Sequence, residues 1–418
     1  MPRHGHRTRR SFAPRFAAGA LGWLLCVGAQ GANDPRLEKL LQGALDRGYP
    51  GLAVAVEQRR GPARFAALGE SDLANHIRLL PNDAFHMASI TKTFTAVAAL
   101  RLVDQGRLKL TSTLSELLGV AAAGIPDAGR ITVAQLLDHS SGIYPTNNDE
   151  EYIATVIGPR ADPRRVWSPA ELVALANGER RKAVAAPGAG HHYSDTNYIL
   201  LGMIVERVSG IPFKQLLTST LLGPLGMTST SFYSDALAAR AQTGKPPPPT
   251  IRGYLLATDD LRQAVAIHPM FRPVPGLASK YGPLLDTTLA AERIDAAAGL
   301  VTTLPDLLRF AAALFRGKLV APASQRVLFA AGDGLLAEPL GSQRVGTLQS
   351  VRKPWGIALY KEGDGPGGVN TLMAYEPVSD TVFLGFTNVF GHFDEIDYLF
   401  DEVLGKVLSE SDGPRPAS

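Results

Sequence analysis

The chain has 418 residues, 45% hydrophobic and 19% charged, a composition that is typical of a folded globular protein and excludes a mainly disordered one. The net charge of +3 at pH 7 comes from five arginines in the first 29 residues, a stretch without acids, and subtracting them leaves −2 for the rest. This balance removes the support for nucleic-acid binding through an overall basic surface.

The first 29 residues have the pattern of an export signal. A basic stretch precedes an apolar run at 16–29, which is shorter and richer in small residues than an ordinary membrane-spanning helix. The Val-Gly-Ala sequence at 27–29 fits a cleavage site, and Arg9 and Arg10 resemble the paired arginines of twin-arginine export signals. We therefore expect a cleaved signal peptide at 1–29, with an uncleaved N-terminal anchor as the alternative.

Residues 30–418 are then the mature chain, which we expect to be periplasmic or secreted and to have no stable membrane span after cleavage. The only cysteine of the chain, Cys26, lies in the leader. The mature chain therefore contains no thiol, which excludes disulfides, cysteine nucleophiles and thiolate metal sites.

Strand-forming patterns lie near both ends of the mature chain. Two short runs at 51–58 and 63–68 are separated by Arg-Arg-Gly-Pro, which predicts a hairpin. Similar runs return at 355–360, 369–375 and 381–388. Because strands at both ends enclose a helical middle, we expect an α+β fold in which the two chain ends build one sheet.

The pattern between these strands is mostly helical. A capping box at 168–171 predicts the start of one helix, and the apolar pattern at 199–208 predicts another that ends at Gly210. A last helix with one apolar face is predicted over 396–407. We expect a helical lobe at roughly 111–295 beside the sheet, and a cleft between two such lobes is a usual place for a site.

Ser89 and Lys92 begin a helical pattern that runs to Gly106. Because the two residues are three apart on a helix, the lysine amine would lie beside the serine hydroxyl. A serine hydroxyl is a weak nucleophile until a base takes its proton, and a lysine that is kept neutral can do so. The same Ser-x-x-Lys pattern recurs at 350–353, but Pro354 disfavours a helix there. Ser89 is therefore the candidate nucleophile, with an ordinary helix cap as the alternative.

Other candidate groups lie in the middle of the chain. Tyr193 stands just before a helical pattern, and an aligned phenol can relay a proton between a nucleophile and a leaving group. His191 and His192 point apart on extended backbone, and no carboxylate stands at helical ligand spacing from them. We therefore expect no metal and no cofactor.

Four motifs, taken in order, resemble the serine β-lactamase-related family, which includes class C β-lactamases, D-alanyl-D-alanine carboxypeptidases and related esterases. The resemblance covers roughly residues 36–408 and implies an antiparallel sheet flanked by helices, with a mostly helical lobe inserted. The motifs are Ser89-Ile-Thr-Lys92, Leu136-Leu-Asp-His-Ser-Ser-Gly142, Tyr193-Ser-Asp-Thr-Asn-Tyr198 and Gly223-Pro-Leu-Gly-Met227.

This resemblance implies acyl transfer. Ser89 attacks a carbonyl and forms an acyl-enzyme, Lys92 and Tyr193 handle its proton, and water releases the product. Which of the two is the base stays open at this point. The backbone N–H of Ser89, with a second one near Asp364, is expected to stabilise the oxyanion.

Two positions depart from the family pattern. Asp195 stands where the family usually has asparagine, and an ionised carboxylate only accepts hydrogen bonds. The third motif, usually Lys-Thr-Gly or His-x-Gly, is either Lys361-Glu362-Gly363 with one extra residue in the following turn, or a gapless register with Glu362 at the basic position. We prefer Lys361, because an extra turn residue costs little while a carboxylate would repel an anionic substrate. Asp195, Lys361, Gly363 and Asp364 are therefore the candidate substrate-binding residues.

The sequence thus predicts an exported serine hydrolase, either D-alanyl-D-alanine carboxypeptidase-like or acting on a small ester or amide. The expected partner is a small-molecule or peptide substrate, such as a peptidoglycan-type peptide, an ester or a β-lactam, and not a nucleic acid. A class C-type β-lactamase is one alternative. A catalytically silent module that recognises penicillin or binds peptidoglycan is another, although the set of Ser89, Lys92 and Tyr193 argues against it.

Overall fold

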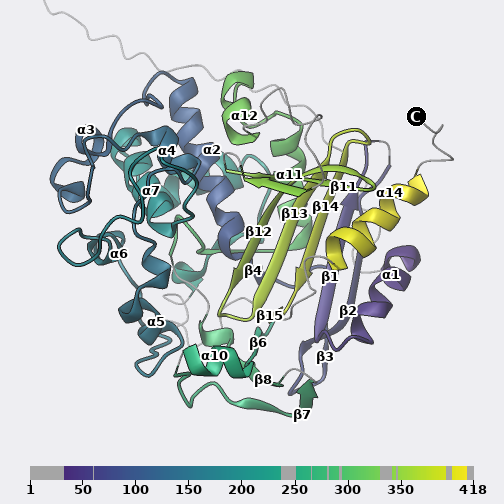
Figure 1. Ribbon diagram of the computed structural model, residues 1–418. Coiled ribbons are helices and arrows are strands. Elements are labelled where there is room, and N and C mark those ends of the chain that lie inside the picture. Colours follow the sequence, from purple (N-terminus) through teal and green to yellow (C-terminus); the bar gives the residue numbers. More distant parts are fainter. Residues whose placement is uncertain are drawn as a thin grey trace, which may run out of the picture.

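The computed structural model centres on an eight-stranded antiparallel sheet with helices on both faces (Figure 1). The expected signal peptide, with Cys26, lies outside the described residues. The structure describes residues 33–59, 61–236, 251–264, 266–279, 282–290, 294–329, 341–344, 347–391 and 398–411.

The central sheet joins the two ends of the chain, as the sequence predicts. Strand β1 pairs antiparallel with β14, from Leu52 opposite Thr387 to Glu57 opposite Val382, and β1 also forms the predicted hairpin with β2. The order across the sheet is β10-β11-β12-β13-β14-β1-β2-β3. Its strands are β1 (Gly51–Glu57), β2 (Arg64–Asp72), β3 (Ile77–Arg78), β10 (Gly341–Arg344), β11 (Gln349–Lys353), β12 (Gly356–Gly365), β13 (Val369–Glu376) and β14 (Thr381–Thr387).

Strand β11 was not predicted, and it settles the local structure of the second Ser-x-x-Lys pattern. Ser350 lies in this strand, opposite Leu359 of β12, and its side chain is buried. The serine and the lysine of that pattern are therefore on extended backbone, where residues three apart point to opposite faces. The prediction that no helix forms there is confirmed.

Each face of the sheet is covered by helices (Figure 1). On one face, α1 packs on β1 and β2 and against a π-helical segment that leads into α14. On the other face, α11 packs on β1 and β14. These elements are α1 (Pro35–Leu45), the π-helical segment Tyr398–Leu404, α14 (Gly405–Ser411), α11 (Leu304–Phe315) and the nearby α12 (Pro322–Phe329).

Helix α7 is the centre of the helical lobe and packs against α2, α3, α4, α6 and α8. It ends before Gly210, whose φ of +71° is in the left-handed region that suits glycine, and the predicted capping box at 168–171 starts α6. The lobe helices are α3 (Leu114–Leu118), α4 (Val133–Leu137), α5 (Glu150–Val156), α6 (Pro169–Leu175), α7 (Asp195–Ser209) and α8 (Phe213–Leu217).

The segment expected as the helical lobe, roughly 111–295, also contains strands. These strands, β5 to β8, pair with β4, β9 and β15 from outside the segment to form two small sheets, ordered β4-β9-β5 and β15-β6-β8-β7. Strands of two or three residues show no alternation in sequence, so nothing local predicts most of them. The elements are β4 (Phe85–His86), β5 (Ser231–Phe232), β6 (Tyr254–Leu256), α10 (Asp259–Ala264), β7 (Pro273–Ser279), β8 (Gly282–Asp286), β9 (Leu300–Thr302) and β15 (Val389–Phe390).

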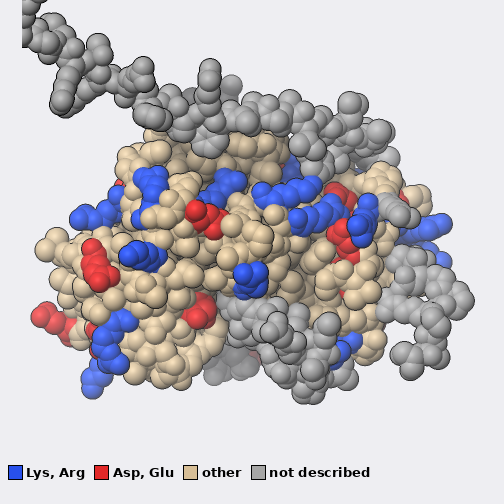
Figure 2. Space-filling view, turned by 90° about the horizontal axis from the view of Figure 1, so that it is seen from above, with Lys and Arg blue, Asp and Glu red and all other residues tan. Residues whose placement is uncertain are grey.

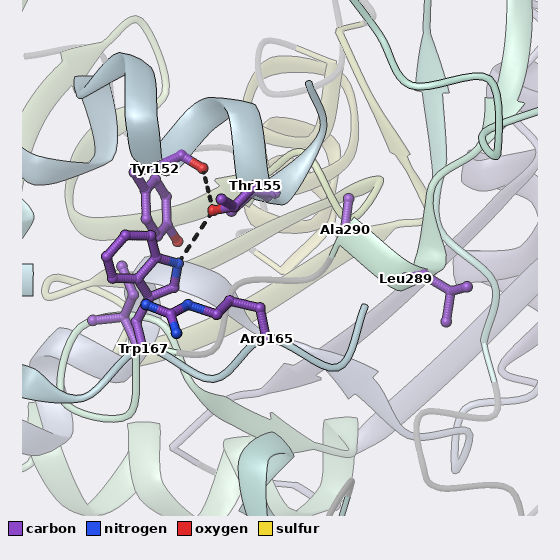
Figure 3. A pocket seen from close by; sticks show the side chains of 8 residues that line it. Tyr152, Thr155, Arg165, Trp167, Leu289 and Ala290 are labelled. Atoms are coloured by element: carbon purple, nitrogen blue, oxygen red, sulfur yellow. Dashed lines mark hydrogen bonds between the residues drawn. The ribbon is translucent and has the colours of Figure 1, made fainter. Parts of the chain in front are cut away.

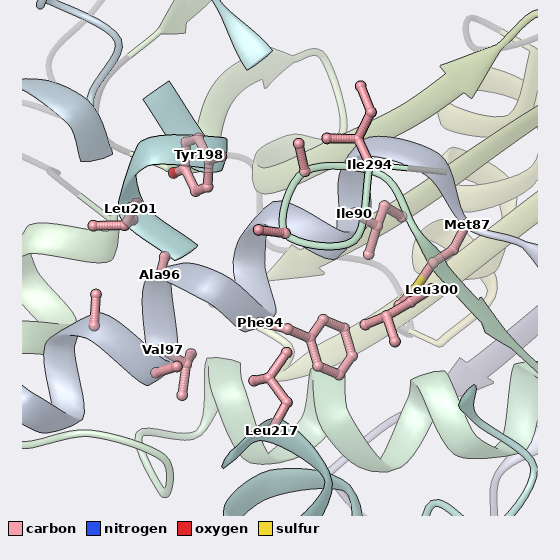
Figure 4. Close-up of a cluster of buried hydrophobic side chains, with 14 of the residues drawn as sticks. Met87, Ile90, Phe94, Ala96, Val97, Tyr198, Leu201, Leu217, Ile294 and Leu300 are labelled. Atoms are coloured by element: carbon pink, nitrogen blue, oxygen red, sulfur yellow. The ribbon is translucent and has the colours of Figure 1, made fainter. Parts of the chain in front are cut away.

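Helix α2 (Thr91–Asp104) runs through the core between the sheet and the lobe. Its first ten residues are all buried, and the ring of Phe94 stacks on Phe310 of α11 at 3.5 Å between centroids. Figure 4 shows side chains of α2 among residues of α7, including Tyr198 and Leu201. Because α2 is packed on all sides, the turn at its N-terminus is held in a fixed position.

Figure 2 shows Lys and Arg side chains interspersed with Asp and Glu on the upper face of the molecule. Within the described part of the chain, every helix is too short or too polar to cross a bilayer.

Candidate active site

The candidate nucleophile lies in a 3₁₀ turn, η1 (Ala88–Ile90), that leads directly into α2. Ala88 has a φ of +44°, a left-handed conformation that costs a residue with a side chain about 1 kcal/mol or more. Hydrogen bonds hold the turn: the N–H of Met87 donates to Leu300 O at 3.1 Å. Ser89 is only 8% exposed. The backbone thus presents this hydroxyl from a rigid, strained turn.

The Lys92 amine is fully buried beside Ser89. Its Nζ donates to Ser89 Oγ at 2.8 Å and to Ala297 O at 3.0 Å, and it forms an ion pair with Asp195. An ammonium has three N–H donors, of which two are used in these hydrogen bonds, and the carboxylate of Asp195 compensates its charge. Burial alone lowers the pKa of Lys92, but the charge of Asp195 and the Tyr193 phenol together raise it above the usual value. Lys92 is therefore a cation at neutral pH.

Tyr193 approaches the nucleophile from the lobe. Its phenol oxygen lies 2.8 Å from Ser89 Oγ, and its ring centroid is 5.1 Å from Lys92 Nζ and 5.0 Å from Lys361 Nζ. Burial raises the pKa of Tyr193 to about 12, although the charge of Lys92 acts in the opposite direction. The phenol is therefore neutral at physiological pH, and its hydroxyl hydrogen can rotate between acceptors.

His139 packs on the ring of Tyr193, with 4.4 Å between the ring centroids. Its Nδ1 accepts the Ser194 N–H at 3.2 Å and lies 3.1 Å from Nδ2 of Asn197. Burial, helped by the charges of Lys361 and Lys92, holds the pKa of His139 well below its usual value. The histidine is therefore a neutral acceptor that orients Tyr193 and the start of α7.

The third motif lies on β12, which packs against the η1 turn. Residues two apart share a face of a strand, so Lys361 and Gly363 face the turn while Glu362 and Asp364 project from the opposite face. Lys361 is 4% exposed, and its ammonium lies over the Tyr193 ring. Burial and the charge of Lys92 lower the pKa of Lys361 to about 8. The lysine that faces the candidate site is thus Lys361, as in the register with one extra turn residue.

Along the third motif, only one edge of β12 is paired with a described strand. Strand β11 pairs with β12 only as far as Tyr360 opposite Gln349, whereas β13 pairs with it through Gly365 opposite Val369. Strand β12 therefore extends past the described end of β11 along the motif. Asp364, in this extension, is exposed.

Gly363 sets the spacing between β12 and the nucleophile turn. A Cβ at this position would lie 2.3 Å from Met87 O and 3.1 Å from Ser89 N. We expect Gly363→Ala to push the strand away from the turn, with a loss in kcat/KM of about 100-fold and in stability of about 1–3 kcal/mol. Steady-state kinetics and urea denaturation measure both effects.

Gly129→Ala is the matched control, because the atom nearest to its added Cβ, Ser115 Oγ, is 3.8 Å away. That variant should behave as the parent protein does. A fully active Gly363→Ala protein would show that the close approach is unimportant for the chemistry.

Several contacts of the site were not predicted from the sequence. Ala297 O, Asn197 and the ion pair of Lys92 with Asp195 all depend on which segments meet in space. One local feature could have indicated that Asp195 and Asn197 belong to the site: both lie in the first turn of the helix that begins immediately after Tyr193.

A separate pocket lies in the lobe, next to α5, and its lining includes none of the predicted site residues (Figure 3). The indole N–H of Trp167 donates to Thr155 Oγ1 at 3.3 Å, and that hydroxyl donates to Tyr152 O at 2.9 Å. The Arg165 guanidinium stacks 4.5 Å above the indole. These polar groups serve to hold the pocket wall together. Within the described residues, no cluster of His, Cys, Asp and Glu could hold a metal ion.

Comparisons with known proteins agree with this architecture. The Beta-lactamase family model matches residues 37–405. A D-stereospecific amidohydrolase from Streptomyces sp. superimposes with a TM-score of 0.70 at 23% identity, over 88% of this chain and 97% of the other. A D-amino acid amidase from Ochrobactrum anthropi SV3 gives 0.70 at 22% identity, over 90% and 99%. At these identities the likeness shows the fold alone.

Protein flp of Staphylococcus aureus (strain N315) is 28% identical to this chain over 202 residues. The matched part is 48% of this chain and 38% of the Staphylococcus protein, so the chain spans well under half of that relative's length.

Proposed function

Because the chain belongs to the beta-lactamase family, we propose that it is a serine hydrolase that forms an acyl-enzyme on Ser89. The family acts on small amide and ester substrates. The observation that carries the proposal is the convergence of Lys92 Nζ and the Tyr193 hydroxyl on Ser89 Oγ, each at 2.8 Å. This arrangement is what a hydroxyl nucleophile needs, because the phenol can relay its proton and the ammonium can stabilise negative charge on its oxygen.

We assign the proton relay to Tyr193. Lys92 is an ammonium that donates to Ser89 Oγ and Ala297 O and pairs with Asp195, so it has no lone pair with which to accept a proton. As Ser89 Oγ bonds to the carbonyl carbon, its proton passes to the phenol oxygen, and the phenol gives its own proton to the leaving nitrogen or oxygen. The phenol is neutral before and after this relay, which fits a pKa raised to about 12.

The cation and the backbone stabilise the charges that develop during attack. The Lys92 ammonium stabilises negative charge on Ser89 Oγ, and the N–H groups of Ser89 and Asp364 are proposed to bind the oxyanion. In the second half-reaction, water is the nucleophile and Ser89 Oγ is the leaving group. A water attacks the acyl carbon, its proton passes to Tyr193, and Tyr193 returns a proton to Ser89 Oγ.

Among the expected activities, we propose hydrolysis of a small amide or ester over D-alanyl carboxypeptidase or class C β-lactamase activity. The two solved neighbours named as an amidohydrolase and an amidase support this choice. The carboxylate of Asp195, in place of the amide usual in the family, argues against recognition of a penicillin amide side chain. A catalytically silent module is disfavoured by the hydrogen bonds of Lys92 and Tyr193 to Ser89.

The test is to incubate the purified protein with a fluorophosphonate probe and with a 4-nitrophenyl ester, and to locate any label by mass spectrometry. We expect ester turnover and a single label on Ser89. Absence of both turnover and label would favour the silent module, and a label on another serine would refute the assignment.

Tyr193→Phe removes only the relay hydroxyl, so we expect kcat to fall by at least about 100-fold with little change in KM. The matched control is Tyr398→Phe, whose hydroxyl bonds to Leu40 O on the other face of the sheet. The control should retain full kcat. Stopped-flow measurement of acylation identifies the step that is lost, and near-normal acylation by Tyr193→Phe would leave this tyrosine a structural role only.

We also propose that the chain is exported and cleaved near residue 30, on the strength of the leader pattern. N-terminal sequencing of the protein after expression of the full chain in a Gram-negative host tests this. A periplasmic form that starts near Gln30 is the expected result. A chain that begins at Met1 or Pro2 would point to an anchor or to retention inside the cell.

A further inference from the structure

The carboxylate of Asp195 contacts Lys92 and is shielded from solvent. Asp195 is the first residue of α7, and α7 packs on α2, which carries Lys92. The side chains of Lys92 and Asp195 are 0% and 4% exposed, so the ion pair between them is almost completely shielded from water. A carboxylate that is used in this way has little exposed surface to offer to a substrate. The effect of Asp195 is therefore on Lys92.

The other partners of the Lys92 amine carry no negative charge. Its two hydrogen bonds go to neutral oxygens, the hydroxyl of Ser89 and the carbonyl of Ala297. Two tyrosine rings lie nearby, with the centroid of Tyr193 at 5.1 Å and that of Tyr198 at 6.0 Å from Nζ. Burial raises the pKa of both phenols, so both are neutral at physiological pH.

Two further titratable groups on neighbouring elements face the same site. Lys361 of β12 lies over the ring of Tyr193, on which His139 also packs. A second cation disfavours a charge on Lys92, and the neutral His139 does not compensate that charge. In the part of the chain that the structure describes, the only carboxylate that pairs with Lys92 is that of Asp195. This carboxylate is therefore the group that opposes the cost of burying an ammonium.

On the basis of the proposed hydrolase function, we infer that Asp195 is a positioning residue that holds Lys92 in its ammonium form. Only Tyr193 then moves a proton at Ser89, and acylation is independent of pH across the neutral range. Ser89 Oγ gives its proton to the phenol oxygen, and the phenol gives its own proton to the leaving group, while the ammonium keeps all three of its protons. The asparagine that is usual in the family at this position carries no charge and would not stabilise a buried ammonium in this way.

Removal of the charge of Asp195 should make acylation depend on pH. In Asp195→Asn, burial and the charge of Lys361 act on Lys92 without an opposing carboxylate, so we expect its pKa to fall from above the usual value into the neutral range. The ammonium is complete below that pKa and is lost as the pH rises through it. The kcat/KM of the variant should therefore fall by about tenfold between about pH 5.5 and 7.5. The parent value should stay constant within about twofold, because its Lys92 keeps the proton and its phenol, with a pKa raised to about 12, stays neutral.

The first measurement is kcat/KM for 4-nitrophenyl butyrate over this pH range, because this parameter reports the pKa values of the free enzyme. The ester is neutral, so its own charge does not enter the profile. The range ends below pH 8, since burial and the charge of Lys92 lower the pKa of Lys361 to about 8. The matched control is Asp127→Asn, the same chemical change at an exposed carboxylate of the lobe that pairs with Arg130. It should follow the parent profile at every pH.

The second measurement observes Lys92 itself and needs no turnover. In protein with ¹³C-labelled lysine, the NMR shift of each Cε reports whether its Nζ is protonated. The Lys92 signal is the one that is missing from the double variant Lys92→Met with Asp195→Asn. In the parent this signal should remain that of an ammonium up to about pH 9, whereas in Asp195→Asn it should change to that of an amine with a midpoint below about pH 8. Circular dichroism at each pH checks that the proteins are folded.

Several results would refute the role of Asp195 while the hydrolase stands. One is a profile of the folded Asp195→Asn protein that is flat or that rises with pH, and a rising profile would make Lys92 the base. Another is a Lys92 signal that titrates below about pH 9 in the parent, which decides the question even if the variant does not fold. A third is an Asp195→Asn protein that is inactive at every pH while its Lys92 remains an ammonium, which would assign the carboxylate to substrate binding.

Failure of the proposed function gives a different result. The parent protein then neither hydrolyses the ester nor takes a label on Ser89, and the inferred role of Asp195 in acylation fails with it.

Discussion

Ser89→Ala is expected to lower ester and amide turnover by at least about 10⁴-fold and to abolish covalent labelling, while the protein remains folded. The nucleophile is lost, and neither neighbour can replace it, because Lys92 only stabilises charge on its oxygen and Tyr193 only relays its proton. The loss of a single oxygen at a position 8% exposed leaves the packing of the turn nearly unchanged. Single-turnover kinetics and intact-mass spectrometry measure the two losses, and thermal unfolding checks the fold.

Ser350→Ala is the matched control, since this serine belongs to the second Ser-x-x-Lys pattern but lies in β11. Turnover and labelling of this variant should equal those of the parent protein. Residual labelling of the Ser89→Ala protein at Ser350 would refute the assignment of the nucleophile.

Lys92→Met is expected to lower the free energy of unfolding by about 3–5 kcal/mol, in addition to a loss in kcat of at least about 100-fold. The ammonium is the ion-pair partner of Asp195, and its removal leaves a nearly fully buried carboxylate without a compensating charge. Urea denaturation monitored by circular dichroism at neutral pH gives the change in stability.

The double variant Lys92→Met with Asp195→Asn separates the two effects. Removing both charges should restore most of the lost stability, because no unpaired buried charge remains. Turnover should stay low, since the cation next to Ser89 is still absent. Full stability of the single Lys92→Met variant would show that the ion pair does not contribute to the fold, and recovery of turnover in the double variant would show that Lys92 has no part in the chemistry.

Local sequence signals predicted the elements that depend on few residues. The capping box at 168–171 and the glycine stop at Gly210 mark the ends of two helices, and the runs near 51–68 and 369–388 mark strands. Strands β10 and β11 were missed. Their sequences lack clear alternation of polar and apolar residues, and they form because β12 offers an edge for pairing.

In the candidate site too, contacts between neighbours in the sequence could be predicted, whereas contacts between distant segments could not. Ser89 and Lys92 are neighbours on one helical stretch, so their contact follows from spacing alone. Tyr193 meets Ser89 from 104 residues away, and Ala297 O meets Lys92 from 205 residues away. No local pattern fixes such distances: the position of Tyr193 before a helical pattern made it a candidate, but only the resemblance to a family placed it beside Ser89. The partner of Asp195 could not be predicted, because two helices must pack before its carboxylate reaches an amine.

The pairing of β1 with β14 has a consequence for the order of folding during synthesis. Leu52 is made 335 residues before its partner Thr387, so at about 5–20 residues per second roughly 20–70 s separate the two on the ribosome. Until then β1 has no β14 to pair with, and the turn that carries Ser89 lacks the strand with Gly363 that packs against it. If the proposed function holds, we therefore expect no hydrolysis by the nascent chain until β12, β13 and β14 have emerged from the ribosome.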